Sequence, residues 1–391
     1  MGKNWRNKNW ERVGKSKTPR KNARVAKAND KNLLDEEFIL SDEGFAKVIR
    51  DDLLFEARVV EVHKKYAFIS PVSKTGEINT RDVWLATVAR KFLQAERTER
   101  NFLAVGDLVV CKAGGDGVEE VSADMPSCTV EARRTRINKI ARIAPLRNDL
   151  SHVLAANIDR LVIVASLLDP KVKWGLIDRY LTLAESEKID PVILLTKKDL
   201  IESEEKSKYR EECMGYVGIY EKIGYQIHMV QVNLQENSNA DSLSILASIF
   251  KDKVCLVSGH SGVGKSSIVN LLEPEIEQEV EDNDIFYKGR HTTTYSSLIK
   301  LGKGGYVVDS PGIRSFLIEE RTHHDLAYCF REFRPFLGNC KYRECRHIDE
   351  PNCAIRDAAG GDEISAWRYK SYLGILLGAT GREGRLRDKE L

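Results

Sequence analysis

Two rhythms of apolar and polar residues divide most of the chain. Between about residues 53 and 142, short apolar runs are separated by glycine and aspartate, as in FEARVVEV, KYAFISPV, GDLVVCKA and SCTVEARR. Short strands at this spacing are typical of a small antiparallel barrel. An OB-type barrel is the expected form, and an SH3-like barrel fits nearly as well. Segment 86–100 has a helical composition, so we predict a helix inserted between strands there.

The second rhythm begins near Asn157 and alternates buried strands with amphipathic helices. The apolar residues of segment 175–188 share one face of a helix. Strands are predicted for four apolar runs: 160–167, 191–196, 225–232 and 253–259. Alternation of this kind indicates an α/β region built on a mainly parallel sheet.

The net charge of +2 conceals a basic N-terminus on an acidic remainder. Residues 1–31 carry eleven Lys and Arg against two acidic residues, a net of +9, which leaves −7 for the rest. A basic arm is an electrostatic handle for nucleic acid. Trp5 and Trp10 add rings that can stack on exposed RNA bases. A solubilising tail is the alternative explanation.

The composition excludes other classes of protein. Hydrophobic residues make up 42% and charged residues 31%, as in a globular protein with a proper core. We expect no membrane span, because no apolar run reaches about eighteen residues. The N-terminus lacks the apolar segment of a secretory signal. We expect a cytoplasmic, monomeric protein that works without a membrane.

Residues 259–266, GHSGVGKS, match a phosphate-binding loop between a predicted strand and the helical segment SSIVNLL. Glycines let backbone N–H groups surround phosphate oxygens, and the helix N-terminus adds partial positive charge. Lys265 is expected to contact the β- and γ-phosphates, which makes it a catalytic candidate, and Ser266 to ligate Mg²⁺. The predicted nucleotide contacts here are Gly259, His260, Ser261, Gly262, Val263, Gly264, Lys265, Ser266 and Ser267.

The segment Thr196-Lys197-Lys198-Asp199 follows a predicted strand and is expected to recognise the base. An aspartate there accepts from the ring N–H and the exocyclic amine of guanine, which adenine cannot match. Lys197 is expected to lie along the base and brace the phosphate loop. The usual pattern begins with Asn, so Thr196 is a departure that leaves the discriminating Asp199 in place. This pattern favours GTP and argues against an ATP-dependent enzyme.

Two later segments complete a nucleotide site. Asp309-Ser-Pro-Gly312 matches the D-x-x-G sequence that senses a γ-phosphate, with Asp309 near Mg²⁺ and the Gly312 N–H toward the phosphate. The segment GRHTTT, 289–294, is a candidate switch loop whose Thr293 completes the Mg²⁺ shell. Four such segments in one α/β region predict a GTPase domain.

A cluster near the C-terminus predicts a metal site. The segment C-x(4)-C-x-H-x(5)-C offers three thiolates and one imidazole, a full tetrahedral set for one structural Zn²⁺. The expected ligands are Cys340, Cys345, His347 and Cys353. Because no coordination position remains open, a catalytic zinc is not expected. Buried free cysteines beside a surface histidine are the alternative.

The order base reader, phosphate loop, threonine switch and D-x-x-G is a circular permutation of the ordinary GTPase order. With AANIDRLVIVAS, LIDRYL and DSPGIRSF, it resembles the ribosome small-subunit-dependent GTPases of the RsgA (YjeQ/YloQ) family over roughly residues 55–375. The resemblance implies an N-terminal OB-fold, a zinc domain and a role in late small-subunit maturation. The family's Ser-Ala base contact has no secure match in 230–238.

Hydrolysis needs a group that orients the attacking water. The position after D-x-x-G, often Gln, is Ile313 here, which cannot do so. His291 in the switch loop is the intrinsic candidate, and the resemblance points to the same histidine acting on the ribosome. We therefore expect a slow GTPase that the small ribosomal subunit stimulates. An RNA-binding scaffold with a structural nucleotide is the alternative function.

The expected fold is multidomain: an OB-like β-barrel, a circularly permuted P-loop GTPase α/β domain and a zinc-binding domain. The expected boundaries are 1–50 for a basic flexible arm and connector, 51–145 for an OB-fold RNA-binding domain, 150–322 for the GTPase domain, and 323–391 for the zinc domain with its charged tail. The expected partners are the small subunit with its rRNA, and GTP or GDP.

Overall fold

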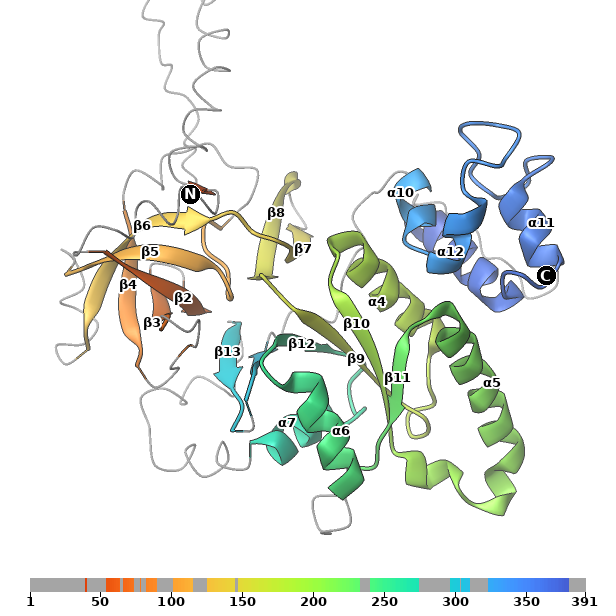
Figure 1. Cartoon of the computed structure of the whole chain (residues 1–391), viewed down its shortest axis with the longest axis horizontal. Helices are drawn as coiled ribbons and strands as arrows, with labels where there is room; N and C mark the ends of the chain where they lie inside the picture. The colour runs from red at the N-terminus through yellow and green to blue at the C-terminus, as the bar shows by residue number, and fades with distance from the viewer. Residues whose placement is uncertain are drawn as a thin grey trace, which may run out of the picture.

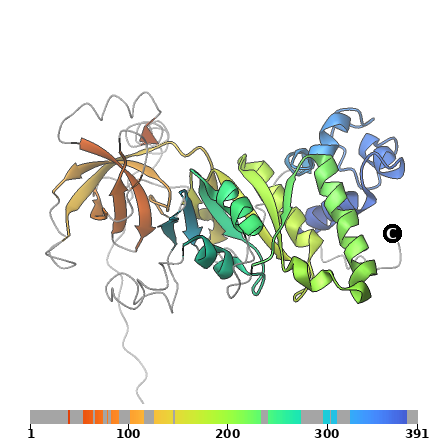
Figure 2. The ribbon, with the colours of Figure 1, turned by 60° about the horizontal axis from the view of Figure 1, so that its bottom comes forward.

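The computed structural model describes residues 39–40, 54–63, 66–73, 78, 82–89, 101–114, 125–144, 147–232, 240–273, 296–302, 304–309 and 323–379. Three regions follow one another in a row (Figures 1 and 2). A strand barrel forms one end, a sheet between helices forms the centre, and short helices form the other end. We call them the barrel, the central region and the C-terminal region.

The barrel closes in the order β2-β3-β4-β6-β5-β2. Its strands are β2 (Leu54–Val62), β3 (Ala67–Pro71), β4 (Trp84–Val88), β5 (Leu108–Ala113) and β6 (Ser127–Arg134). β4 and β6 are parallel, and the other pairs are antiparallel. Alternate residues point inward, so Val59, Ile69 and Val130 are fully buried in one core. The short strand β1 (Ile39–Leu40) lies parallel to β6.

The central region is a sheet in the order β13-β14-β12-β9-β10-β11. Its strands are β9 (Arg160–Ser166), β10 (Asp190–Thr196), β11 (Gln226–Met229), β12 (Val254–Ser258), β13 (Ser297–Lys300) and β14 (Tyr306–Asp309). Only β13 is antiparallel to its neighbour in this sheet. β9, β10 and β12 are apolar almost throughout because both faces of the sheet are covered.

Helices cover both faces of the central sheet. The helices are α4 (Trp174–Glu187), α5 (Ser207–Ile223), α6 (Ala240–Phe250) and α7 (Lys265–Leu272), with short 3-10 turns η1 (Lys198–Ile201) and η2 (Glu204–Lys206). α4 and α5 share a core with Ile163 and Ile193, whereas α6 and α7 share another with Val162 and Val164. These side chains alternate along their strands, which is why one sheet supports two cores.

A hairpin of β7 (Lys139–Ala144) and β8 (Arg147–Ala156) connects the barrel to β9. Two asparagines fix its base. Asn138 donates to the carbonyl of Ile158 at 2.9 Å and accepts from the N–H of the same residue at 2.8 Å. Asn157 donates to the Gly106 carbonyl at 3.1 Å, which holds the start of the central region against the barrel.

The C-terminal region packs its own apolar core and lies against α4 (Figure 1). Its elements are α10 (His323–Tyr328), the 3-10 helix η5 (Arg331–Phe336), α11 (Ala354–Gly360) and α12 (Ala366–Ala379). Phe330, Phe333 and Tyr372 are fully buried and meet in edge-on or tilted ring contacts. Aromatic burial therefore supplies much of this small core.

The predicted central strands and the helix at 175–188 are confirmed within a few residues. The helix predicted for 86–100 is wrong over residues 86–88, which belong to β4, and residues 90–100 lie outside the described part. Leu85 and Ala86 are buried between β3 and β6, and this packing outweighs helix propensity. Among the described helices, none has the length and apolar character needed to span a bilayer.

Candidate functional site

The phosphate-loop segment lies where β12 ends and α7 begins. A Cβ atom on Gly259 would lie 2.1 Å from the Val164 carbonyl oxygen, so only glycine fits beside β9. Gly264 has a φ of 93° and precedes Lys265, the first residue of α7. Val263 is buried in the core under α6 and α7 and anchors the loop. The loop is thus shaped to turn backbone N–H groups toward a phosphate.

The polar side chains of the loop are exposed or lie along the loop itself. The Lys265 ammonium donates to the carbonyls of Gly259 at 2.9 Å and His260 at 2.7 Å, so it lies against the loop. Ser261 and Ser266 are exposed. The next residue, Ser267, is half-buried in the first turn of α7.

Thr196 joins the predicted base-reading segment to the phosphate loop. Its hydroxyl donates to the Val263 carbonyl at 2.7 Å, and the side chain is almost fully buried at the end of β10. Lys197, expected to brace the phosphate loop, instead donates to the Asp169 carbonyl in the β9–α4 connection. The bracing role therefore lies with Thr196, the residue that departs from the usual Asn.

The remaining residues of the predicted base-reading segment lie at the surface. Lys198 and Asp199 begin η1 and are both exposed. Lys198 forms an ion pair with Glu202 at 3.7 Å along the same turn. Its ammonium is therefore partly neutralised, whereas the Asp199 carboxylate is open to a ligand.

These segments meet at the carboxyl ends of parallel strands. β12 and β10 both pair with β9, and α4 and α7 leave the sheet toward opposite faces. Ligands in open α/β sheets bind at such a switch point. Asp309 is the last residue of β14, whose backbone pairs with Ser297 of β13. The predicted residues His291, Thr293 and Gly312 lie outside the described residues.

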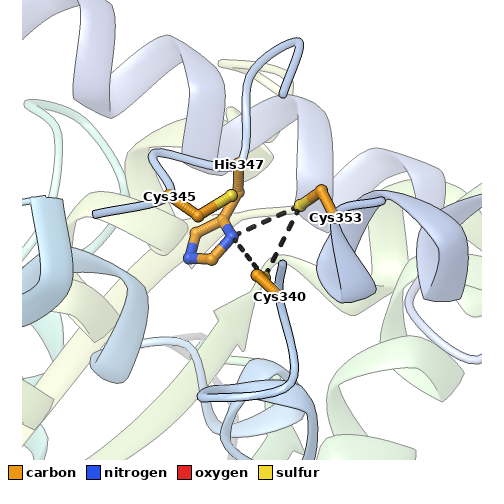
Figure 3. Close-up of side chains that lie close together, drawn as sticks. All are labelled: Cys340, Cys345, His347 and Cys353. Atoms are coloured by element: carbon orange, nitrogen blue, oxygen red, sulfur yellow. Dashed lines mark hydrogen bonds between the residues drawn. The ribbon is translucent and has the colours of Figure 1, made fainter. Parts of the chain in front are cut away.

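The four predicted zinc ligands converge in the C-terminal region (Figure 3). Their ligand atoms all lie within 4.8 Å of one another. The His347 Nδ1 atom lies 3.5 Å from Cys340 Sγ and 3.4 Å from Cys353 Sγ, and the two sulfurs are 3.9 Å apart. Tetrahedral zinc would separate two sulfurs by roughly 3.8 Å and sulfur from nitrogen by roughly 3.6 Å. The residues present fit the ion.

Three residues that sequence reasoning missed hold the backbone around His347. The Glu350 carboxylate accepts from the N–H groups of Arg346 and Ile348, both at 2.8 Å. The Tyr369 hydroxyl donates to the His347 carbonyl at 2.7 Å, and the Tyr372 hydroxyl donates to the Arg346 carbonyl at 2.9 Å. Only Glu350 is near enough in sequence to have been suspected. The tyrosines reach this loop from α12.

Local environment shifts the acidity of this cluster. Burial raises the pKa of the Cys345 thiol to about 12 and also raises the pKa of Cys353. Thiolates are the metal-binding form, so an ion must displace these protons on binding. Burial also acts to raise the pKa of Glu350, but backbone N–H groups, led by that of Arg346, lower it to about 2.

Comparison with known proteins decides the family. A model of the RsgA GTPase family matches residues 131–319. A Vibrio parahaemolyticus protein named small ribosomal subunit biogenesis GTPase RsgA 1 is 38% identical over 277 residues, 70% of this chain and 73% of the relative. A Haemophilus influenzae protein of the same family name is 38% identical over 271 residues, 69% of this chain and 73% of the relative. The chain belongs to the RsgA GTPase family.

Solved structures agree with this assignment. YloQ, described as a circularly permuted GTPase, matches with a TM-score of 0.61 and 26% identity over 85% of this chain and 97% of that one. YjeQ from Thermotoga maritima matches with a TM-score of 0.62 and 27% identity over 84% of this chain and 100% of that one. The chain is therefore a GTP-hydrolysing enzyme of the RsgA family with a circularly permuted GTPase fold and a five-stranded N-terminal barrel.

Proposed function

We propose that this GTPase acts in late maturation of the small ribosomal subunit and that the subunit stimulates its GTP hydrolysis. The observation that carries the proposal is the Thr196–Val263 hydrogen bond, which joins a guanine-reading segment to a phosphate loop. Relatives at 38% identity are named small ribosomal subunit biogenesis GTPases. The small ribosomal subunit is proposed as the partner on the basis of that name.

In this proposal the nucleotide lies across the carboxyl ends of β9, β10 and β12. The Asp199 carboxylate reads guanine, and Lys265 with the loop N–H groups binds the phosphates. Ser266 ligates the Mg²⁺ ion that accompanies GTP, together with Asp309 and Thr293. The ion supplies charge neutralisation at the phosphates when bound. The Gly312 N–H faces the γ-phosphate.

The other two regions have binding roles in the proposal. We assign residues 51–145 to an OB-fold that binds rRNA. The closed order β2-β3-β4-β6-β5 with parallel β4 and β6 supports an OB-fold over an SH3-like barrel. We assign residues 323–391 to a domain built around one structural Zn²⁺, residues 150–322 to the GTPase and 1–50 to a basic arm. We further propose that the protein is monomeric and cytoplasmic.

We assign the hydrolytic step to His291. Ile313 cannot orient water, so the free enzyme is slow. Docking on the small subunit brings His291 toward the γ-phosphate, where its imidazole orients the attacking water. An RNA-binding scaffold with incidental turnover would need no such rearrangement.

The test measures phosphate release from GTP with and without purified small subunits. We expect a large stimulation, and an excess of ATP should compete poorly with GTP. His291→Ala should retain GTP binding and subunit docking but lose most of the stimulation. Lys265→Ala should impair nucleotide binding or turnover in both conditions. Unchanged phosphate release with subunits present would reject the switch and favour the scaffold.

A further inference from the structure

An open groove of about 760 Å³ lies between the C-terminal region and the phosphate loop. One wall is the start of α4, and the other is α12, which lies beside α4 in Figure 1. His260 and Ser261 of the phosphate loop line one end, and both are exposed. A ligand in the groove would therefore touch the GTPase site and the C-terminal region together.

The groove is positively charged on both walls. Lys173 and Arg179 extend from the α4 side and Lys370 from α12, and all three are exposed. No carboxylate is among the described residues that line the groove. None of these three cations has an ion pair within the described part of the chain. The first turn of α4 has no acidic residue and no capping side chain, so its partial positive charge adds to theirs.

Other cations at the contact between α4 and the C-terminal region are paired with carboxylates. Arg331 and Arg334 both pair with Glu185 of α4, and Arg368 of α12 pairs with Asp178 of α4. The acidic residues of α4 that face the C-terminal region are thus used in fixing it. The groove cations stand apart from this pairing, which leaves their charge available to an anionic partner.

The shape of the groove suits an extended backbone. Gly175 on one wall and Gly374 on the other lie where an added Cβ atom would meet nothing within 4 Å. Small residues on both walls let a chain approach closely without displacing side chains. The Lys and Arg side chains that line the groove are of the kind that contact RNA phosphates. Such contacts position an RNA strand without reading its sequence.

We propose that this groove binds the phosphodiester backbone of an RNA strand next to the phosphate loop. The proposal rests on the proposed function, because the small subunit is the source of that RNA. Binding there engages α4, α12 and the phosphate loop at once. Docked RNA therefore holds the C-terminal region in a fixed place relative to the GTPase site.

The first experiment measures affinity for purified small subunits across a salt series, with the full-length protein. The double variant Arg179→Gln, Lys370→Gln removes one cation from each wall. The matched control, Lys208→Gln, Lys222→Gln, removes two exposed cations from α5, away from the groove. Two lost phosphate contacts should reduce the slope of log affinity against log salt by roughly 1.4 to 1.8, and the control should leave it unchanged. Equal slopes for the two double variants would overturn the proposal.

The second experiment separates charge from bulk. Gly374→Glu places a carboxylate in the groove, whereas Gly374→Gln places a neutral side chain of the same size there. Both should fold, because the site is open and either residue favours a helix more than glycine. We expect weaker subunit binding for Gly374→Glu than for Gly374→Gln, with equal basal GTP hydrolysis. Equal binding by the two variants would contradict the groove.

Two further outcomes identify the occupant. Single-stranded poly(U) should compete with subunits for the unmodified protein and compete less well for the double variant. Competition by poly-glutamate but not by poly(U) would overturn an RNA occupant in favour of an acidic protein. If subunits fail to stimulate the unmodified protein, the proposed function itself fails. If they stimulate it but every groove variant binds normally, only the groove fails.

Discussion

The barrel and the C-terminal region are joined to the central sheet by different kinds of contact. The barrel is joined through backbone, because β13 pairs with β14 on one edge and with β2 on the other, at Ser297 and Glu61. In addition, the Tyr306 hydroxyl donates a hydrogen bond to the Ile78 carbonyl at 2.8 Å and accepts one from the Ile78 N–H at 3.0 Å. The barrel is thus a continuation of the central sheet.

The C-terminal region is joined through buried charge. Arg368 is 1% exposed and contacts Asp178 of α4 and, at 2.6 Å, Glu332 of η5. Burial acts to lower the pKa of Arg368, but the carboxylates of Asp178 and Glu332 raise it above its usual value. The Tyr220 hydroxyl donates to Asp178 at 2.8 Å. Here geometry depends on a few paired side chains rather than on a strand ladder.

The difference has a mechanical consequence. β13 follows the segment 289–294 and β14 ends at Asp309, so a shift in either strand passes directly to the barrel. The C-terminal region can move away from α4 only if the buried ion pair between Arg368 and Asp178 separates, which is costly. The central region therefore has a continuous joint to the barrel, made of paired strands, and a discrete joint to the C-terminal region, made of a few ion pairs.

The largest effect should come from removing the proposed zinc ion from the C-terminal region. Structural zinc sites in small peptides bind with about 10–16 kcal/mol, so Cys345→Ser or chelation should unfold this region locally. The barrel and central sheet should stay joined and bind GTP. Elemental analysis and near-ultraviolet circular dichroism provide the measurements. Cys329→Ser is the matched control, because this buried thiol of the same region lies outside the cluster. Equal damage by both variants, or purified protein without stoichiometric metal, would contradict the zinc site.

The next effect should come from breaking the discrete joint. Arg368→Met leaves the fully buried Asp178 and the nearby Glu332 without their cation, which should cost roughly 3–5 kcal/mol of unfolding free energy. Denaturant unfolding of the full chain measures this loss. The control is Arg334→Gln, which is partly exposed and leaves Arg331 to neutralise Glu185, so its cost should stay below about 1 kcal/mol. Similar losses for the two variants would show that burial does not set the strength of this joint.

The backbone joint should respond less. Tyr306→Phe removes both hydrogen bonds to Ile78, at about 1 kcal/mol each. The strand pairing between β13 and β2 should survive. Hydrogen exchange should accelerate at the Ile78 amide, and the global unfolding free energy should fall by about 2 kcal/mol. Tyr342→Phe, at a residue that is 46% exposed, should alter neither measurement. Complete separation of the barrel in Tyr306→Phe would mean that the strand pairing carries little of the joint.

Local patterns predicted those parts of the molecule whose determinants are close in sequence. The apolar runs of β9, β10 and β12 predicted a parallel sheet because each strand is buried on both faces. The Cys340–Cys353 cluster was predictable because all four ligands lie on one short segment. The order of the nucleotide-site segments along the chain predicted the circular permutation. The spatial order of the strands in the sheet does not depend on where the chain begins.

Contacts between distant segments escaped prediction. The partners Asp178 and Arg368 are 190 residues apart, and nothing in either segment indicates an ion pair. The choice between an OB-type and an SH3-like barrel depends on the parallel pairing of β4 with β6. This pairing forms when the barrel closes, and the sequence of neither strand indicates it. Thr196 was expected only as a departure from the usual Asn, and its hydrogen bond to the Val263 carbonyl joins segments 67 residues apart, which no local pattern indicates.

The smallest effect should come from Glu350, which positions the metal loop without touching the joints. Its folded pKa of about 2 lies below the usual 4.5, because backbone N–H groups such as that of Arg346 stabilise the carboxylate. A lowered pKa stabilises the fold above about pH 4.5, and this contribution disappears as the pH falls toward about 2. Glu350→Gln should therefore unfold slightly more easily at neutral pH, by less than about 1 kcal/mol for a partly exposed group.

The difference between Glu350→Gln and the unmodified protein should vanish through the same acid range. Loss of the proposed zinc ion at low pH would affect both proteins, so the difference between them isolates the effect of the carboxylate. An NMR titration of the Glu350 side chain gives the direct measurement. A midpoint near 4.5 would mean that the backbone N–H groups of Arg346 and Ile348 do not hold the carboxylate in solution. His347, which lies between them with a left-handed φ of 61°, would then need another support, and Tyr369 is the remaining contact to its carbonyl.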